Sequence, residues 1–186
     1  MTETVVSTRV KSRRPMICED EVRYLAAQYG APLRCTFTIQ ADEYIRAYRW
    51  RKDLDRRAEV VFAIQDPLCR IWLHAKRHYP KHIFRLPSGG INWDEPVMDA
   101  LHREIAEETG WRVGYLRRIG AYRRFTYMPE YDLWAEKICH VYSGRPTLRR
   151  GQPSEQHHLA LWAAPEVALE LVGNDGERRF LGKLFR

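Results

Sequence analysis

The sequence predicts a layered α/β domain preceded by an N-terminal extension. From residue 58 onward, apolar runs of strand length alternate with turn residues, a pattern typical of a sheet-forming domain. Helical patterns stand before, within and after these runs, so we expect helices to pack in layers on a mixed set of strands. With 186 residues, 45% of them hydrophobic, the chain can bury the core of one compact domain. We therefore expect an extension over residues 1–57 and a folded domain over residues 58–186.

The extension is expected to have mixed structure. Residues 1–15 are polar and basic, and we expect them to be mobile. Acids in the first turn and a glycine after the end predict a short helix over 19–29. A strand is expected at 33–39 and a helix at 41–53. No motif decides whether the extension covers a site, adds a strand or builds a dimer interface.

The elements of the folded domain are predicted from apolar patterns and from the turn residues between them. We expect, in chain order, strands at 59–65 and 70–76 joined as a hairpin, a segment at 84–90, a helix at about 95–109, strands at 113–127 and 132–142, a loop at 144–156, a strand at 159–163, a helix from Pro165 and another over 176–186.

Composition excludes several classes of protein. No apolar run approaches the roughly 18 residues that a membrane span requires, and the N-terminus has no apolar core of the signal-peptide type. We therefore expect a soluble, cytoplasmic protein with no membrane partner. None of the four cysteines forms a CxxC pair, which argues against a zinc ribbon.

The charges are unevenly distributed along the chain. The formal net charge is +7, yet residues 89–111 contain six acids and one base, a net of −5. The remainder therefore carries +12, the difference between +7 and −5. An acidic segment within a basic chain would suit a cation bound by carboxylates and an anionic substrate attracted by the surrounding Lys and Arg.

The predicted helix at 95–109 carries this acidic segment. We expect Asp94 to cap it, Pro96 to stand in its first turn and Gly110 to end it. Met98, Leu101 and Ile105 fall on one apolar arc of this helix.

Three glutamates, Glu104, Glu107 and Glu108, share the neighbouring arc of the helix. Like charges at i, i+3 and i, i+4 spacings repel, but a bound Mg²⁺ or Mn²⁺ reverses the sign of that energy because hard cations prefer oxygen ligands. Arg103 lies beside this arc and can orient a glutamate by a charge-assisted hydrogen bond. The preceding Gly89-Gly90 pair permits a tight turn and close backbone approach.

The segment from Gly89 to Trp111 resembles the Nudix box, G-x5-E-x7-R-E-U-x-E-E-x-G-U, in which U is a bulky aliphatic residue. The matching residues are Gly89, Glu95, Arg103, Glu104, Ile105, Glu107, Glu108 and Gly110. Trp111 at the final U is apolar but aromatic, and Asn92 and Asp94 replace residues that are common in the first gap.

The resemblance implies an α/β/α sandwich with a mixed sheet, in which the box forms a loop–helix–loop. It also implies a hydrolase that uses Mg²⁺ or Mn²⁺ to cleave a nucleoside diphosphate linked to another group. By position, Glu104, Glu107 and Glu108 would be metal ligands, Arg103 would hold a glutamate, and Glu95 and the Gly89 carbonyl would assist in the metal shell. Many members add an acid from a later loop as ligand or general base; Glu155 is the first candidate and Glu130 the second. Dimers are common in the family.

Substrate contacts are expected beside the box. Lys76, Arg77, Lys81 and Arg85 precede the glycines and are candidates for phosphate contacts, with a solvated rim as the alternative. Phe125, Tyr127 and Tyr131 are candidates for stacking on a nucleobase, with burial in the core as the alternative.

Three functions stay open at this stage. The first is hydrolysis of a small nucleotide substrate. The second is pyrophosphohydrolysis at the 5′ triphosphate end of RNA, which the +12 remainder motivates. The third is a regulator with the same fold that binds a nucleotide or nucleic acid without cleaving it, since fold alone does not specify function.

Overall fold

The structure is a computed structural model, and it describes residues 20, 23–24, 26–27, 33–38, 56–77, 79, 81–128, 133–154 and 159–186. The elements within these ranges are β1 (Leu33–Thr38), β2 (Arg56–Ile64), β3 (Ile71–Ala75), β4 (Ser88–Asn92), α4 (Val97–Thr109), β5 (Trp111–Met128), β6 (Leu133–Arg149), β7 (Leu159–Ala163), α5 (Pro165–Leu171) and α6 (Asp175–Leu184).

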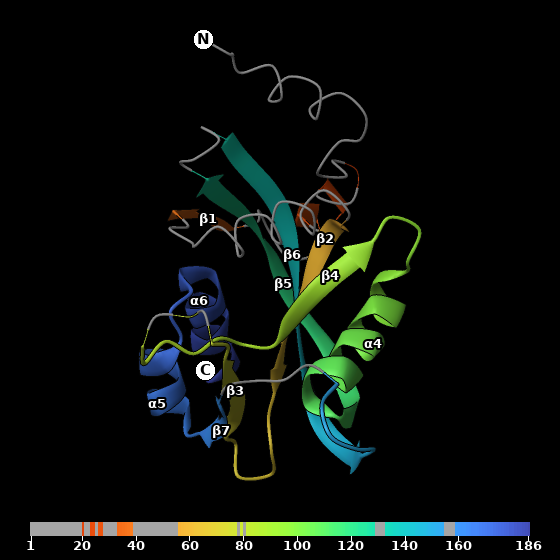
Figure 1. The fold of residues 1–186 in the computed structure, drawn as a ribbon, viewed down its shortest axis with the longest axis vertical. Coiled ribbons are helices and arrows are strands. Elements are labelled where there is room, and N and C mark those ends of the chain that lie inside the picture. The colour runs from red at the N-terminus through yellow and green to blue at the C-terminus, as the bar shows by residue number, and fades with distance from the viewer. Residues whose placement is uncertain are drawn as a thin grey trace.

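Five strands form a mixed sheet in the order β1-β5-β6-β2-β4. The β1–β5 and β2–β6 pairs are parallel, while β5–β6 and β2–β4 are antiparallel. Strands β3 and β7 form a separate antiparallel pair. Figure 1 shows the large sheet between α4 on one side and the α5–α6 pair on the other, which confirms the predicted α/β/α layering.

The two faces of the large sheet are both buried, and β2 shows how its sequence achieves this. Ala58, Val60, Phe62 and Ile64 pack with the apolar side chains of α4, whereas Val61 and Ala63 pack with the side of α5 and α6. Successive residues of a strand point to opposite faces, so a continuous apolar run is what a strand between two helical layers requires.

The N-terminal extension contributes a strand to this sheet. β1 pairs in parallel with the distal half of β5, from Leu33 opposite Tyr122 to Thr38 opposite Tyr127. The predicted strand at 33–39 is thus confirmed, and of the three roles considered for the extension the structure shows the added strand. Residues 20, 23–24 and 26–27 are helical, within the predicted helix. The arm at 1–15 and the helix at 41–53 lie outside the described residues.

The predicted hairpin between 59–65 and 70–76 is wrong. Both strands exist, but β2 pairs with β4 and β6, while β3 pairs with β7. Only an isolated bridge from Gln65 to Ile71 joins β2 and β3. Apolar patterning predicts that a segment is a strand, but its partner depends on which other edges the folded chain brings near.

The predicted loop at 144–156 begins too early, because β6 continues through Arg149. Here β6 pairs only with β5, and the register shifts between Arg112 and Val113 beside Pro146. A proline is tolerated on such a two-stranded edge because its missing N–H costs no ladder bond. Strand β4 was not predicted; it includes both glycines of the 84–90 segment and pairs with β2.

The start of α4 also differs from the prediction. Pro96 is the N-cap residue and no side chain caps the helix, so Asp94 does not fill that role. A turn bond from Glu95 N–H to the Asn92 carbonyl precedes the helix instead. Gly110 ends the helix in the left-handed conformation, at φ 71°, as predicted. The strand at 159–163 and the two C-terminal helices are confirmed.

None of the helices in the described part of the chain is both long and apolar enough to span a bilayer.

Candidate active site

Helix α4 buries part of its acidic arc. Glu104 is 4% exposed and Glu108 is 1% exposed, on the same stripe as Leu101 and Ile105. Met98, predicted to lie on the apolar arc, is 41% exposed. Carboxylates are almost never buried to this extent without partners. The three helix glutamates, Glu104, Glu107 and Glu108, are therefore held in place by specific contacts.

Gly89 makes room for the first of these carboxylates. A Cβ atom at this position would lie 1.8 Å from Cδ of Glu104, far inside van der Waals contact. Gly89 and Gly90 are part of strand β4, so they do not form the tight turn that the sequence suggested. Gly89 instead allows two groups to approach closely: because it has no side chain, the Glu104 carboxylate can lie directly against the strand backbone.

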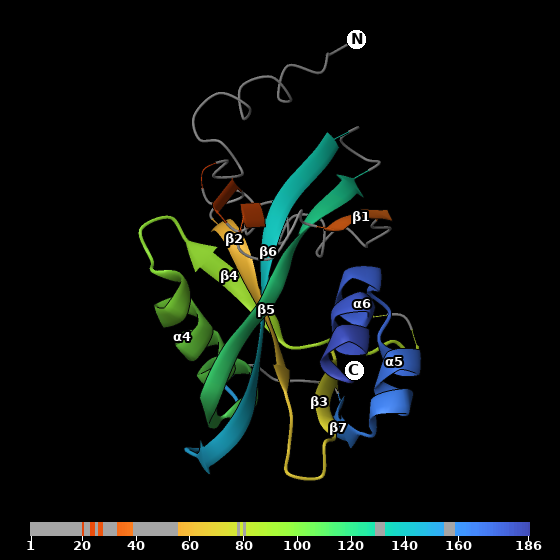
Figure 2. The same cartoon turned by 180° about the vertical axis from the view of Figure 1, so that it is seen from behind.

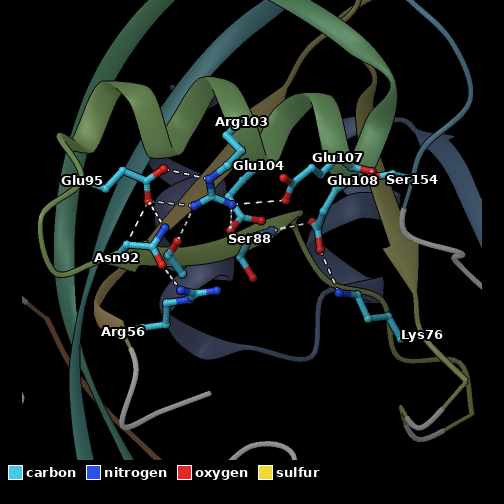
Figure 3. Close-up of polar contacts among 11 residues, drawn as sticks. Arg56, Lys76, Ser88, Asn92, Glu95, Arg103, Glu104, Glu107, Glu108 and Ser154 are labelled. Carbon is cyan, nitrogen blue, oxygen red and sulfur yellow. Dashed lines mark hydrogen bonds and ion pairs between the residues drawn. The ribbon is translucent and has the colours of Figure 1, made fainter. Parts of the chain in front are cut away.

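Arg103 connects the loop before α4 to the helix glutamates, as Figure 3 shows. Its Nε and Nη2 donate to the two oxygens of Glu95, each at 2.8 Å. Its Nη1 donates to Glu104 at 2.7 Å and to Glu107 at 3.2 Å, and Nη2 also donates to the Gly90 carbonyl at 2.9 Å. The predicted contact between Arg103 and a glutamate is therefore present, with three glutamates rather than one.

Glu95 is fixed from two sides. Besides Arg103, the backbone N–H and side-chain amide of Asn92 donate to its Oε2 at 3.0 and 2.9 Å. The hydrogen bonds from Arg103 hold the pKa of Glu95 at about 2, well below its ordinary value of 4.5. Arg56 donates in turn to the amide oxygen of Asn92. Asn92, a departure from the usual box, therefore orients Glu95.

Glu108 has its own cation. Nζ of Lys76 lies 2.8 Å from Oε1, and the backbone N–H of Ser88 donates to Oε2 at 2.8 Å. Nδ1 of His74 lies 3.9 Å from Oε2, and both side chains are 1% exposed. Lys76 directly follows β3, outside the large sheet, so sequence reasoning placed it near the site but did not identify its partner. No sequence signal pointed to Ser88 or His74.

The loop that follows β6 is attached to the C-terminal half of α4. The backbone N–H and the hydroxyl of Ser154 donate to the Glu107 carbonyl at 2.9 and 3.3 Å. Gly110 and Gly151 are packed so closely that a Cβ at Gly110 would lie 2.3 Å from the Gly151 carbonyl oxygen. Glu155, the first candidate for an additional acid, directly follows Ser154 but lies outside the described residues, as does Glu130.

The predicted substrate contacts fall in different environments. Arg77 is exposed, immediately after Lys76. Arg85 donates to the buried carboxylate of Glu177 in α6, with Nε at 2.7 Å, and this partner raises its pKa against the effect of burial. Arg85 is therefore held in an ion pair with Glu177, and we do not propose it as a substrate contact. Phe125 and Tyr127 are part of β5 by their backbone, and their side chains lie outside the description.

The donor set fits a hard divalent cation. The three helix glutamates offer carboxylate oxygens on adjacent turns of one helix, and the Gly89 backbone lies against one of them. Within the described ranges, no three acidic, His or Cys side chains already converge as a metal-binding group. Arg103 and Lys76 hold the carboxylates by ion pairs instead, so a metal would take over part of the charge balance that these two cations now supply.

Comparison with known proteins gives the family and the fold. The sequence pattern of the NUDIX domain matches residues 54–184. A comparison with curated protein sequences found no match. Among solved structures, the NUDIX domain of Shewanella oneidensis NrtR, complexed with ADP ribose, is 13% identical, with 69% of this chain and 85% of that chain covered and a TM-score of 0.55.

Two further structures cover a similar share of the chain. The Escherichia coli dihydroneopterin triphosphate pyrophosphohydrolase is 13% identical, with 69% and 94% of the two chains covered and a TM-score of 0.53. A MutT Nudix hydrolase from Burkholderia pseudomallei is 22% identical, with 68% and 96% covered and a TM-score of 0.53. At these identities the structures show the shared fold, and the domain match shows the family. By this domain match, the chain belongs to the NUDIX domain family.

Proposed function

We propose that the protein is a pyrophosphohydrolase that depends on Mg²⁺ or Mn²⁺ and cleaves the diphosphate of a nucleoside diphosphate linked to another moiety. One observation carries the proposal: two glutamates of α4, Glu104 and Glu108, are almost fully buried and held by an arginine and a lysine. Burying charged groups in this way costs free energy. A helix with only a structural role would gain nothing that offsets this cost. The cost is accounted for if the carboxylates bind a cation.

The three helix glutamates are proposed as metal ligands, with Glu95 and the Gly89 carbonyl assisting. These oxygens would hold a divalent cation, which would supply charge neutralisation for the phosphates and activation of a water. Arg103 keeps Glu95, Glu104 and Glu107 in position through the bonds described above. Positioning of this kind accounts for most of the catalysis in phosphoryl transfer, because little covalent chemistry is left to the protein.

The general base and the substrate contacts are proposed from the contacts of the described residues next to them in the sequence. The backbone N–H of Ser154 donates to the carbonyl of Glu107, and Glu155 directly follows Ser154 in the sequence. We propose it as the additional acid, with Glu130 as the second candidate. Lys76, already at Glu108, and the exposed Arg77 beside it are proposed as contacts for the substrate phosphates.

The substrate class rests on the family and on two relatives. NrtR was solved with ADP ribose, a nucleoside diphosphate linked to a sugar, and the Escherichia coli relative is a pyrophosphohydrolase of a triphosphate. Phe125 and Tyr127 stay candidates for stacking on the base of such a substrate. Removal of phosphate from the 5′ end of RNA has only the overall charge in its favour, so we keep it as an arm of the test.

The test is release of phosphate and nucleotide from a panel of ADP-ribose, NADH, dinucleoside polyphosphates, nucleoside triphosphates and triphosphorylated RNA, each with Mg²⁺, Mn²⁺ or chelator. Glu108→Gln is compared with Glu166→Gln, an exposed acid of α5. We expect metal-dependent turnover that Glu108→Gln lowers by at least about 100-fold and that Glu166→Gln leaves unchanged.

Two results would reject the proposal. Near-normal activity of Glu108→Gln would show that the Glu108 carboxylate is not needed for catalysis. Absence of turnover across the panel, with the protein folded and metal bound, would favour the regulator that binds without cleaving. If triphosphorylated RNA alone is cleaved, with a steep dependence on salt, the RNA alternative is correct.

A further inference from the structure

The paired strands β5 and β6 concentrate the positive charge of the molecule. Residues 111–128 and 137–154 together contain nine Arg or Lys and no Asp or Glu. The end of this strand pair that follows α4 consists of residues 111–118 and 143–149, and we call it the ribbon end. Beyond Gly144, β6 pairs only with β5, so most of the ribbon end has little sheet on either side.

Two arginines of the ribbon end, Arg117 and Arg145, are exposed on one face. Gly114 pairs with Arg145, and Arg117 pairs with Ser143. Paired residues of an antiparallel ladder share a face, and so do residues two apart in a regular stretch of one strand. Ser143 and Arg145 of β6 are therefore on one face, about 7 Å apart along the strand, and Arg117 lies on the same face. Arg149 pairs with Trp111 on the other face, beyond the register shift at Arg112 and Val113, and packs over the Trp111 ring at 5.8 Å from its centroid.

This face is not used for packing. The opposite face of the ribbon end contributes Val113, with Leu116 beside it, to the core under α4. In Figure 2 no helix is drawn over the lower ends of β5 and β6, and α5 and α6 lie to the right of them. If the arginines were only a solvated rim, their charge would be explained. The exposed aromatic residue near them would not.

Tyr115 is this aromatic residue. Its side chain is 85% exposed, and its backbone adopts a φ of 53° in the left-handed region. Non-glycine residues rarely adopt this conformation, and such strain clusters at functional sites. It lies at a register irregularity of the ribbon, between Gly114 and Arg117. The result is an aromatic ring presented to solvent two residues from the exposed Arg117.

We propose that the ribbon end is a binding surface for single-stranded nucleic acid, separate from the hydrolytic site. Arg117 and Arg145 would contact backbone phosphates and Tyr115 would stack on an unpaired base, the combination that binds single strands without sequence preference. A duplex hides the faces of its bases, so an exposed ring favours a single strand. An anionic membrane needs a broad apolar surface, and within the described ribbon end Tyr115 and Leu148 are the large apolar side chains that are exposed.

The experiment measures binding of the full-length protein to fluorescein-labelled oligouridylate and oligothymidylate of 12 nucleotides by fluorescence anisotropy. The oligonucleotides carry 5′ hydroxyl groups and the buffer contains chelator, so the result does not depend on hydrolysis or on metal. Affinity is measured from 50 to 300 mM salt for the wild type and for two variants, Tyr115→Ala and the pair Arg117→Ala/Arg145→Ala. The matched control is Arg179→Ala/Arg186→Ala, which removes two exposed arginines elsewhere.

The two variants should weaken binding to the oligonucleotides in different ways. Loss of two phosphate contacts should flatten the slope of log K against log salt by about 1.4, at roughly 0.7 per contact with a single strand. Tyr115→Ala should weaken binding on the order of 5- to 100-fold and leave the salt slope unchanged. The Arg179/Arg186 pair should bind like the wild type, and unfolding midpoints should confirm that all variants are folded.

Three outcomes would overturn the proposal. Equal weakening by the ribbon pair and the control pair would mean attraction by net charge alone. An unchanged affinity of Tyr115→Ala, or equal affinity for a duplex of the same length, would exclude stacking on a base. Binding to vesicles of 30% phosphatidylserine but not to either oligonucleotide would make the ribbon end a membrane contact.

Discussion

At the scale of single residues, the site is a balance between buried carboxylates and two cations. Glu104 and Glu108 would repel each other at their i, i+4 spacing. Arg103 binds Glu104, Glu107 and Glu95, while Lys76 binds Glu108. Arg103 is part of the recognised box, but Lys76 reaches the site from the segment that follows β3. Lys76 therefore has a second expected effect, besides contact with phosphate: it neutralises Glu108 when metal is absent.

Lys76→Met tests this effect. In chelator, the variant leaves the buried Glu108 without its cation, and we expect the free energy of unfolding to fall by ~2 kcal/mol. This is less than for a fully buried pair because Lys76 is 22% exposed. The unfolding midpoint should fall by about 5 °C. Saturating Mn²⁺ should restore it, and calorimetry should show tighter Mn²⁺ binding because no ammonium group competes for the carboxylate. The control is Arg77→Met, and equal behaviour of the two variants would contradict the prediction.

At the scale of elements, the turn after β2 depends on one acid. Asp66, whose side chain is 8% exposed, accepts from the backbone N–H groups of Leu68 and Arg70 at 3.0 and 2.8 Å and from Nε of Arg70 at 2.7 Å. Burial raises the pKa of Asp66, but the hydrogen bonds from Arg70 outweigh it, so the pKa lies below the ordinary 3.8. The turn separates β2 from β3, which enter different sheets.

The depressed pKa makes this contribution depend on pH. The stabilisation is fully present above the unfolded pKa of 3.8 and is lost as pH falls through the lower pKa of the folded state. Asp66→Asn should therefore lower the free energy of unfolding by ~1–2 kcal/mol at pH 7, a difference that shrinks below about pH 3.8. Urea unfolding at pH 7, 5 and 3 measures it, with Glu170→Gln as control. A difference that stays constant to pH 3 would show that the charge of Asp66 is not the cause.

At the scale of the whole molecule, charged side chains join three strands on the face that packs with α6. Glu59 of β2 binds Arg124 of β5 by two hydrogen bonds, and Nζ of Lys137 of β6 lies 3.5 Å from it. All three side chains are at most 14% exposed. Burial raises the pKa of Glu59, but attraction by Arg124 and Lys137 outweighs it and keeps the pKa far below its usual range.

Glu59→Gln should therefore destabilise the fold as a whole. It leaves two buried cations without their carboxylate, and breaking a buried pair in this way costs about 3–5 kcal/mol. Urea unfolding at pH 7 should show the loss as a lower midpoint with an unchanged slope. Glu166→Gln on the surface of α5 should behave like the wild type. If Glu59→Gln unfolds at the wild-type midpoint, the cluster contributes no net stability.

Local sequence was sufficient for most elements and for the box. Helix α4, strand β7 and the two C-terminal helices could be predicted because their apolar periodicity and end residues are contained in the segments themselves. The glutamates, Arg103 and Gly89 could be named because their chemistry depends on spacing along one helix and the turn before it. Strand partners could not be predicted: the strands at 59–65 and 70–76 follow each other in sequence but enter different sheets.

The sequence by itself thus determined the layered α/β class, the family and the residues of the acidic helix, because each depends on patterns that repeat over a few residues. Only the tertiary structure showed that β1 extends the sheet, that Lys76 and Ser88 contact Glu108, that Arg85 pairs with Glu177, and that Tyr115 is exposed among arginines. These contacts join residues far apart in the chain or depend on which faces stay uncovered. Both are properties of how the layers pack, and no short window of sequence contains them.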